Sequence, residues 1–231
     1  MAIGISATDA WREAHPQALV GLLELSGVSN ASPCPALDQR KRSVEAALRE
    51  RYRGFSRGDF VAAPVLSDYV RYYRSFEKTY HVQLQLESIV LKRKSLPSVS
   101  PLVDANFAAE LETLVLTAGH DVARLEAPLR IDVSRAGDSI TQMNGATRAM
   151  REGDMVMRDA AGISCSIIYG QDNRSPISAA TTKVLYVAYG PPGVPEAVIQ
   201  MQLQGILANV RLFAPDCILE RQAVLREATS W

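Results

Sequence analysis

Apolar residues form short runs and alternations along much of the chain, a pattern typical of β-strands. The apolar run at residues 18–25 lies between Pro16 and Gly27, and its length favours a buried strand. Later segments alternate apolar and polar residues or run apolar between glycine-rich turns, which predicts further strands of a sheet. These segments are 129–133, 154–158, 163–168 and 183–188.

Other segments have the spacing and punctuation of helices. Residues 38–53 predict an exposed helix in which Asp38 is the N-cap and Glu45 lies four residues before Arg49. Residues 67–93 predict two helices that meet near residues 78–81.

Two more helices are predicted from capping residues. One is expected to follow Asp104 or Asn106 and to reach about residue 116, because either side chain can accept hydrogen bonds from the first free amides. A long amphipathic helix is expected to begin at Pro195 and to end near residue 213.

Composition limits the class of protein. With 231 residues, of which 47% are hydrophobic and 22% charged, the chain can bury one sizeable core, and we expect a single domain of two lobes. The formal net charge is zero. We find no apolar run of the roughly 20 residues that cross a bilayer, and residues 1–4 do not resemble a signal peptide. We therefore expect a cytoplasmic protein without a membrane partner, and we favour a monomer.

Motifs for metal, cofactor or nucleophilic chemistry are absent from the sequence. Cys34, Cys165 and Cys217 lie far apart, which excludes the spacing of a zinc ribbon or a redox pair. The chain has three histidines and lacks both a phosphate-binding loop and a dinucleotide fingerprint. We therefore expect no metal site and no cofactor.

Basic residues concentrate between positions 40 and 57. The group consists of Arg40, Lys41, Arg42, Arg49, Arg51, Arg53 and Arg57, and a second short group follows at Lys92, Arg93 and Lys94. One interpretation is a solvated helix face. The other is a surface that follows RNA phosphates, which would make binding weaken steeply with salt. Neither a sequence-reading RNA module nor a DNA-binding protein is indicated, because no aromatic platform accompanies these charges.

The most informative segment is 96–107, with the sequence Leu-Pro-Ser-Val-Ser-Pro-Leu-Val-Asp-Ala-Asn-Phe, followed by Ala-Gly-His-Asp at 118–121. Shorter matches follow in order: Met-Asn-Gly at 143–145, Glu-Gly-Asp at 152–154, Ile-Tyr-Gly-Gln at 168–171 and Thr-Thr-Lys at 181–183. This order resembles the B-three/B-four domain, the editing module of the phenylalanyl-tRNA synthetase β subunit. Residues 11–30 resemble the N-terminal extension of free-standing proteins that carry this domain alone.

The resemblance implies a fold and an organisation. It implies an α+β fold in which a mixed sheet is flanked by helices and a pocket lies between two lobes. Residues 1–60 would be the N-terminal extension, 60–190 the family core and 191–231 C-terminal helices.

The resemblance also implies a reaction. The family module hydrolyses the ester of a mischarged tRNA, so the implied function is trans-editing of an aminoacyl-tRNA. An aminoacyl ester is activated by the adjacent ribose hydroxyl, so a positioned water and a polarised carbonyl suffice without a covalent nucleophile. The alternative is a non-catalytic module that binds an amino acid, another small metabolite, a partner protein or tRNA.

Site residues follow from the matched motifs. Gln171 stands where the family has a Glu that recognises the side-chain hydroxyl of the wrong amino acid, so the substrate here can differ from tyrosine. Asn106 and Thr182 are the candidate catalytic residues, and the other candidates for substrate binding are Glu87, Asp104, His120, Thr181 and Ala188. Several have structural alternatives: helix capping for Asp104 or Asn106, strand entry for the two threonines and a surface carboxylate for Glu87.

Overall fold

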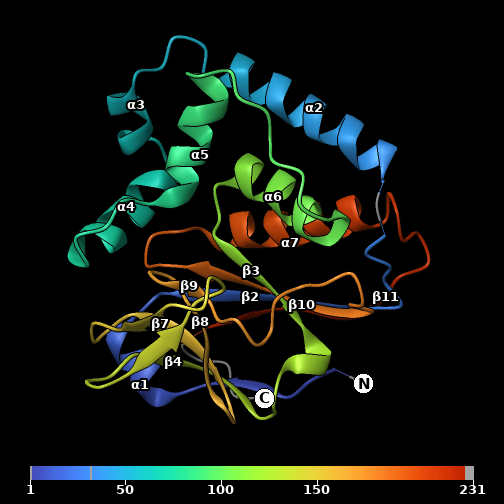
Figure 1. Cartoon of the computed structure of the whole chain (residues 1–231). Coiled ribbons are helices and arrows are strands. Elements are labelled where there is room, and N and C mark those ends of the chain that lie inside the picture. The colour runs from blue at the N-terminus through green and yellow to red at the C-terminus, as the bar shows by residue number, and fades with distance from the viewer. Residues whose placement is uncertain (1, 32, 227–231) are drawn as a thin grey trace.

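The computed structural model describes residues 2–31 and 33–226. The fold has three layers (Figure 1): helices α2–α7 cover one face of a four-stranded sheet, and a five-stranded sheet packs on the other side. In the described part of the chain, no helix combines the length and apolar character needed to cross a membrane.

The four-stranded sheet is antiparallel and has the order β11-β2-β10-β3. Its two central strands are almost entirely buried because they are covered on both faces, which explains their near-continuous apolar sequences. The strands are β2 (Leu19–Ser26), β3 (Thr117–Asp121), β10 (Lys183–Gly190) and β11 (Ile218–Leu225).

The five-stranded sheet has the order β1-β4-β7-β8-β9, and it is mixed because β1 runs parallel to β4 while the other pairs are antiparallel. A two-stranded ribbon, β5-β6, stands beside it. The strands are β1 (Ile5–Ala7), β4 (Leu129–Val133), β5 (Ser139–Thr141), β6 (Thr147–Ala149), β7 (Met155–Asp159), β8 (Gly162–Ser166) and β9 (Gly170–Gln171).

Helices α2–α7 bury their apolar faces on the four-stranded sheet and on one another, whereas α1 packs against β4 of the five-stranded sheet. Besides the short η1 (Val122–Arg124), the helices are α1 (Asp9–Ala14), α2 (Pro35–Arg51), α3 (Arg57–Ala62), α4 (Leu66–Ser75), α5 (His81–Val90), α6 (Pro101–Thr113) and α7 (Glu196–Val210).

The predicted α+β class is confirmed, and all five predicted strands exist close to their expected limits. The strands divide between two main sheets instead of forming one. The expectation of only helices after residue 190 is wrong, because α7 is followed by β11, which pairs with β2. Residues 227–231 lie outside the described part of the chain.

Two predicted caps are corrected by prolines. Helix α2 begins at Pro35, so Asp38 lies within the first turn, and α6 begins at Pro101, so neither Asp104 nor Asn106 is its cap. Proline is favoured at the first helical position because its fixed φ suits a helix and its missing N–H costs nothing there.

Asp104 instead forms a buried ion pair that joins α2 to α6. Its carboxylate lies 2.6 Å from the Nζ of Lys41, and Lys41 is 1% exposed. The Lys41 ammonium also donates to Ser98 Oγ (2.8 Å), and Asp104 accepts the N–H of Val99 (2.9 Å). Helix α2 is therefore not the exposed helix that was predicted, since one face is buried around Lys41.

We expect the substitution Lys41→Met to lower the free energy of unfolding by about 3–5 kcal/mol, because it leaves the Asp104 carboxylate buried without its partner. Chemical denaturation followed by circular dichroism measures the change. Lys92→Met, at an exposed lysine, is the matched control and should change stability by less than about 0.5 kcal/mol. Equal stabilities of the two variants would contradict this role for the pair.

Candidate functional site

A cavity of about 440 Å³ lies where α6, β3, β8, β9 and β10 meet. Its wall is mainly apolar and includes Val103, Phe107, Leu116, Ile167 and Ile177. None of the described residues that line it is an Asp, Glu, Lys or Arg. The cavity is therefore suited to an uncharged, largely apolar group.

The mouth of the cavity is marked by two apolar side chains that are each 64% exposed. Val99 lies in the loop before α6, and Met143 lies in the turn between β5 and β6. His81, the first residue of α5, also lines the cavity. A ligand entering here passes between three separate segments of the chain.

Gln171, at the end of β9, is the best-defined polar group of the wall. Its Nε2 donates to the carbonyl oxygens of Gly119 (2.8 Å) and Ser175 (3.0 Å). Carbonyl oxygens only accept hydrogen bonds, so these contacts fix which end of the amide is the nitrogen. The Oε1 atom accepts no hydrogen bond from the described residues, so it remains available to a donor.

His120 lies behind the wall, next to Gln171. Its Nδ1 lies 2.8 Å from Ser175 Oγ and 3.1 Å from Gln171 Nε2. Since the Ser175 hydroxyl donates to the Asp172 carboxylate (2.7 Å), Ser175 Oγ is left to accept, and the hydrogen of His120 is assigned to Nδ1. Burial lowers the pKa of His120 to about 3, so the ring is neutral. His120 lies in β3, next to Gln171, and does not line the cavity.

Tyr189 and Cys165 bring a hydroxyl and a thiol to the cavity wall. Tyr189 is fully buried, and its hydroxyl lacks a hydrogen-bond partner among the described residues; the Cys165 thiol is its neighbour. Burial raises the pKa of Cys165 to about 12, so it is a thiol and not a thiolate at neutral pH. The structure thus provides a hydrogen-bonding group at Tyr189 and no activated nucleophile at Cys165.

Asn106 lies in the wall and is held by polar neighbours. Its Nδ2 donates to Thr117 O (3.0 Å), and its Oδ1 accepts from Gln202 Nε2 of α7 (3.2 Å). Gln202 also donates to the Thr117 hydroxyl (3.0 Å). The side chain of Asn106 is therefore fixed in orientation. The second hydrogen of its Nδ2 has no acceptor among the described residues.

The other predicted substrate-binding residues lie outside the cavity lining. Thr181 is buried and donates to Asp121 (2.8 Å), while the side chain of Thr182 is exposed. Ala188 is buried in the middle of β10, beside Gly21 of β2. The structural alternative of strand entry fits the two threonines.

The two predicted acidic residues also lie elsewhere. Glu87 is buried between Gln83 (2.8 Å) and Arg57 (3.4 Å), and Asp104 is committed to Lys41. Of the predicted substrate and catalytic residues, the cavity collects Asn106 and Gln171, with His120 directly behind Gln171.

Most of the predicted RNA-binding residues on and after α2 are engaged in the fold. Lys41 is buried and cannot contact a phosphate, which corrects that prediction. Ion pairs join Arg40 to Glu112, Arg42 and Arg49 to Glu45, Arg53 to Glu50 and Arg57 to Glu87. By contrast, Lys92 and Arg93 are exposed and have no ion pair within the described residues.

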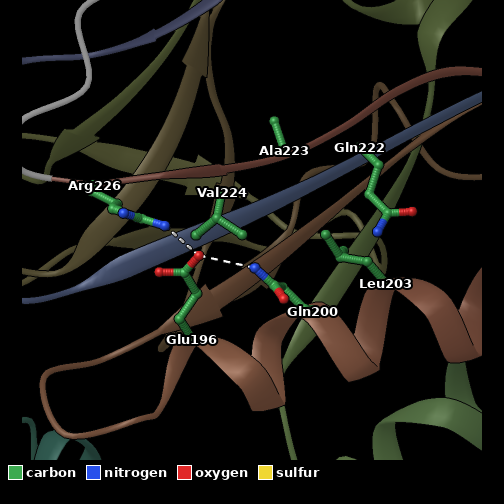
Figure 2. Close-up of a pocket in the computed structure, with 7 residues that line it drawn as sticks. All are labelled: Glu196, Gln200, Leu203, Gln222, Ala223, Val224 and Arg226. Carbon is green, nitrogen blue, oxygen red and sulfur yellow. Dashed lines mark hydrogen bonds and ion pairs between the residues drawn. The ribbon is translucent and has the colours of Figure 1, made fainter.

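A second hollow of about 430 Å³ lies between α7 and β11 (Figure 2). Glu196 of α7 accepts from Gln200 (3.0 Å) and pairs with Arg226 at 2.5 Å. None of the sequence-predicted residues lines it. In the described part of the chain, neither hollow contains a group of three His, Cys, Asp or Glu side chains suited to a metal ion.

Tyr189, Ser175 and Asp172 were missed by sequence reasoning. Tyr189 lies inside an apolar strand, where a tyrosine is expected to be core. Ser175 and Asp172 follow Gln171 within four residues, so their closeness to the matched glycine-glutamine segment was a signal that could have found them.

Comparisons with known proteins were made against families, curated proteins and solved structures. The model of the B3/4 domain family matches residues 68–202. Among solved structures, the chain is similar to an N-terminal fragment of the phenylalanyl-tRNA synthetase β-subunit from Pyrococcus horikoshii, with 6% identity and a TM-score of 0.48. The similarity covers 97% of this chain and 50% of that one, so the chain spans about half the fragment's length. The comparison with curated proteins finds no match.

Glu110 lies on α6, one turn beyond Asn106, and its carboxylate accepts the N–H of Thr117 (2.9 Å). Burial raises the pKa of Glu110 to about 8. A carboxyl whose pKa is higher in the folded protein binds more protons there, so its contribution to stability is complete below about pH 4.5 and is lost as the pH rises toward 8.

We therefore expect Glu110→Gln, which keeps an acceptor for Thr117, to reduce the fall in unfolding free energy between pH 5 and pH 8 by a few kcal/mol, at about 1.4 kcal/mol per pKa unit. Urea denaturation at several pH values measures the difference from wild type. Glu152→Gln, at an exposed carboxylate, is the control. If the unfolding free energy of Glu110→Gln varies with pH in parallel with that of wild type, the Glu110 carboxylate is not buried without a compensating cation.

Proposed function

Because the chain belongs to the B3/4 domain family, we propose that it hydrolyses the ester of a mischarged aminoacyl-tRNA and holds the amino-acid side chain in the 440 Å³ cavity. The observation that carries the proposal is a lining without charged side chains in which one oriented amide, that of Gln171, presents an acceptor. The resemblance of segment 96–121 to the editing module supplies the reaction class.

The absence of charge from the lining favours an esterified amino acid over a free one. A free amino acid carries a carboxylate, and burying a carboxylate without a cation costs several kcal/mol. Esterification to RNA removes that charge. His81, the described lining residue whose side chain can become a cation, has its pKa lowered by partial desolvation of its ring and is neutral near pH 7. A free amino acid, one of the alternatives from the sequence, is therefore the weaker candidate.

Gln171 gives the cavity a preference for a ligand with a hydrogen-bond donor. Its Nε2 is occupied by Gly119 and Ser175, so Oε1 is the atom that meets the ligand. A hydroxyl on the amino-acid side chain satisfies this acceptor, whereas an apolar side chain leaves it desolvated and unpaired. A site built in this way can reject the analogue that lacks the donor.

Hydrolysis in this cavity is proposed to proceed by direct attack of water on the ester carbonyl. A C–O bond forms to the water oxygen, the acyl–ribose C–O bond breaks, and the ribose oxygen leaves with a proton from the water. Cys165 is a protonated thiol, and the Ser166 hydroxyl donates to Asp154, so neither side chain is an activated nucleophile. The second N–H hydrogen of Asn106 is the donor we assign to the ester carbonyl, where it would stabilise the developing oxyanion. Thr182, the other predicted catalytic residue, is exposed outside the lining and is not retained in this role.

The direct test is to incubate the purified protein with tRNAs that carry cognate and noncognate amino acids and to follow loss of the ester at two salt concentrations. We expect selective deacylation that is weaker at high salt. If no tRNA in the panel is deacylated faster than in buffer, the editing function is refuted and the non-catalytic alternative is favoured.

We expect Gln171→Ala to lower discrimination between hydroxyl-bearing and apolar amino acids roughly fivefold, because one hydrogen bond contributes about 1 kcal/mol. The ratio of deacylation rates for the two classes measures this loss. Gln171→Glu should be more damaging, because its carboxylate would face the carbonyl oxygens of Gly119 and Ser175. Unchanged discrimination in Gln171→Ala would place the amino-acid side chain elsewhere.

Tyr189→Phe separates a ligand-binding role from a structural one. Its hydroxyl has no hydrogen-bond partner among the described residues, so removing it should leave the unfolding free energy unchanged or higher. If the ligand supplies the missing bond, deacylation should fall roughly tenfold. Tyr186→Phe is the contrast, because it loses a 2.8 Å bond to Leu102 O and should lose about 1 kcal/mol of stability. A variant Tyr189→Phe with wild-type turnover would exclude the hydroxyl from substrate binding.

A further inference from the structure

We propose that the surface of α5 and the turn after it, from His81 to Lys94, bind the single-stranded 3′ end of the RNA. The inference rests on the proposed function for the acyl group, and it adds the path that the nucleotides take away from the cavity. It depends on three features of the described residues: a shared wall, an apolar groove and a group of unpaired cations.

The shared wall is His81. It lines the 440 Å³ cavity and also a neighbouring groove of about 340 Å³. One side of its ring packs near Tyr80 and Tyr73, with centroids 5.7 and 6.2 Å away, while the residue remains exposed to solvent. A neutral aromatic ring between an acyl pocket and a groove is a surface on which a base can stack.

The groove continues along α5 from this ring. Leu84, which is 40% exposed, forms one apolar side, and Leu96 with Pro97 forms the other. Gln85 and Ser88 add polar groups between them. Apolar walls with a few hydrogen-bonding groups suit a nucleobase, whose faces are apolar and whose edges are polar.

Cations lie at the far end of the groove. Lys94 lines it, and Arg93 lines the next hollow, beside Arg49 and Arg53. Lys92, Arg93 and Lys94 are all exposed, and none has an ion pair with another described residue. Arg49 and Arg53, by contrast, are paired with Glu45 and Glu50. Among the cations that line these two hollows, Arg93 and Lys94 of the turn after α5 are therefore the ones without an ion pair to another described residue.

The turn that carries these cations is fixed. Lys94 N donates to Ser88 O (3.0 Å), and Arg49 Nη2 donates to Lys94 O (3.0 Å). Arg93 has a φ of 53°, a left-handed conformation that reverses the chain direction here. Charges on a fixed turn lose little conformational freedom when they bind, which favours a phosphate contact over an adaptable, solvated tail.

The length of α5 fits the proposed ligand. Its 10 residues rise about 15 Å, at 1.5 Å per residue. Stacked nucleotides advance about 3.4 Å each, so the helix spans about four of them. The unpaired acceptor end of a tRNA has this length, with the acyl group on its last ribose. The ester would then lie beside His81 and the phosphates beside Arg93 and Lys94.

The test measures binding of uncharged tRNA by fluorescence anisotropy, so its result does not depend on catalysis. The double variant Arg93→Glu/Lys94→Glu should weaken binding at least tenfold and lower the slope of log affinity against log salt by about 1.4, at about 0.7 per lost contact with a single strand. Arg130→Glu/Arg211→Glu, at exposed arginines of β4 and the end of α7, makes the same change in net charge and should have little effect. Equal weakening by both pairs would overturn the proposal.

A tRNA without its unpaired 3′ nucleotides identifies the part that is bound. It should bind wild type more weakly than intact tRNA, and it should be insensitive to Arg93→Glu/Lys94→Glu. If the truncated tRNA binds as tightly as intact tRNA or remains fully sensitive, the turn contacts another part of the molecule or another kind of partner, and the proposal is wrong. If the charge-reversal variant Arg93→Glu/Lys94→Glu does not fold, Arg93→Gln/Lys94→Gln is used in its place.

Failure of the proposed function gives a different pattern. In that case intact tRNA would still bind in a way that depends on Arg93, Lys94 and its unpaired 3′ nucleotides, but no ester would be deacylated. A groove that is not used would instead leave deacylation intact in Arg93→Glu/Lys94→Glu. A further variant, Ser88→Trp, should fill the groove and slow deacylation of aminoacyl-tRNA while sparing a small aminoacyl methyl ester. Equal loss on both substrates would contradict a nucleotide in the groove.

Discussion

The position of helix α6 is the constraint on which the rest of the structure depends, and buried polar side chains set it. Asp104 pairs with Lys41 of α2, Asn106 bonds to Gln202 of α7 and Thr117 of β3, and Glu110 accepts the Thr117 N–H. Each contact costs desolvation, and each leaves a buried polar group unpaired if its partner moves. The helix is thereby tied to both neighbouring helices and to the sheet, and its apolar residues Val103 and Phe107 form one wall of the cavity.

The same division of polar and apolar groups defines the chemistry of the cavity. Arg174 is paired behind the wall with Asp159 and Asp172. The side chains that face inward are apolar or neutral, and contacts outside the cavity set the orientation of the polar ones. Gln171 is the best example, because the carbonyl oxygens of Gly119 and Ser175 accept from its Nε2 and leave its Oε1 without a partner among the described residues. Specificity in such a site comes from a polar atom that lacks a hydrogen-bond partner, because the ligand must supply that partner.

Much of the fold could be predicted from sequence, because its signals are local. Alternation found β4, and apolar runs found β2 and β10, since strands covered on both faces are mostly apolar. Helix starts were less accurate because Pro35 and Pro101, each at a first helical position, were weighed less than the nearby carboxylates. The strand β11 was missed because its exposed edge position gives a weak apolar pattern.

The candidate site was predictable in part. Gln171 and Asn106 were found through matched motifs, whereas Thr182, Glu87 and Asp104 came from the same motifs and lie outside the cavity lining. Sequence order places residues near a site without saying which way each side chain points. The basic residues illustrate the same limit. Lys41 and Arg93 both belong to basic groups in the sequence, but in the fold Lys41 pairs with Asp104 and Arg93 has no acidic partner among the described residues.

The central claim is that the cavity accepts an amino acid only after its carboxylate has been neutralised. Isothermal titration calorimetry with one amino acid and its amide, which lacks the carboxylate charge and is not the ester that the protein hydrolyses, tests this directly. The account predicts that the amide binds and that the free amino acid binds at least tenfold more weakly. Equal or tighter binding of the free amino acid would show that the site tolerates the carboxylate and would contradict the account.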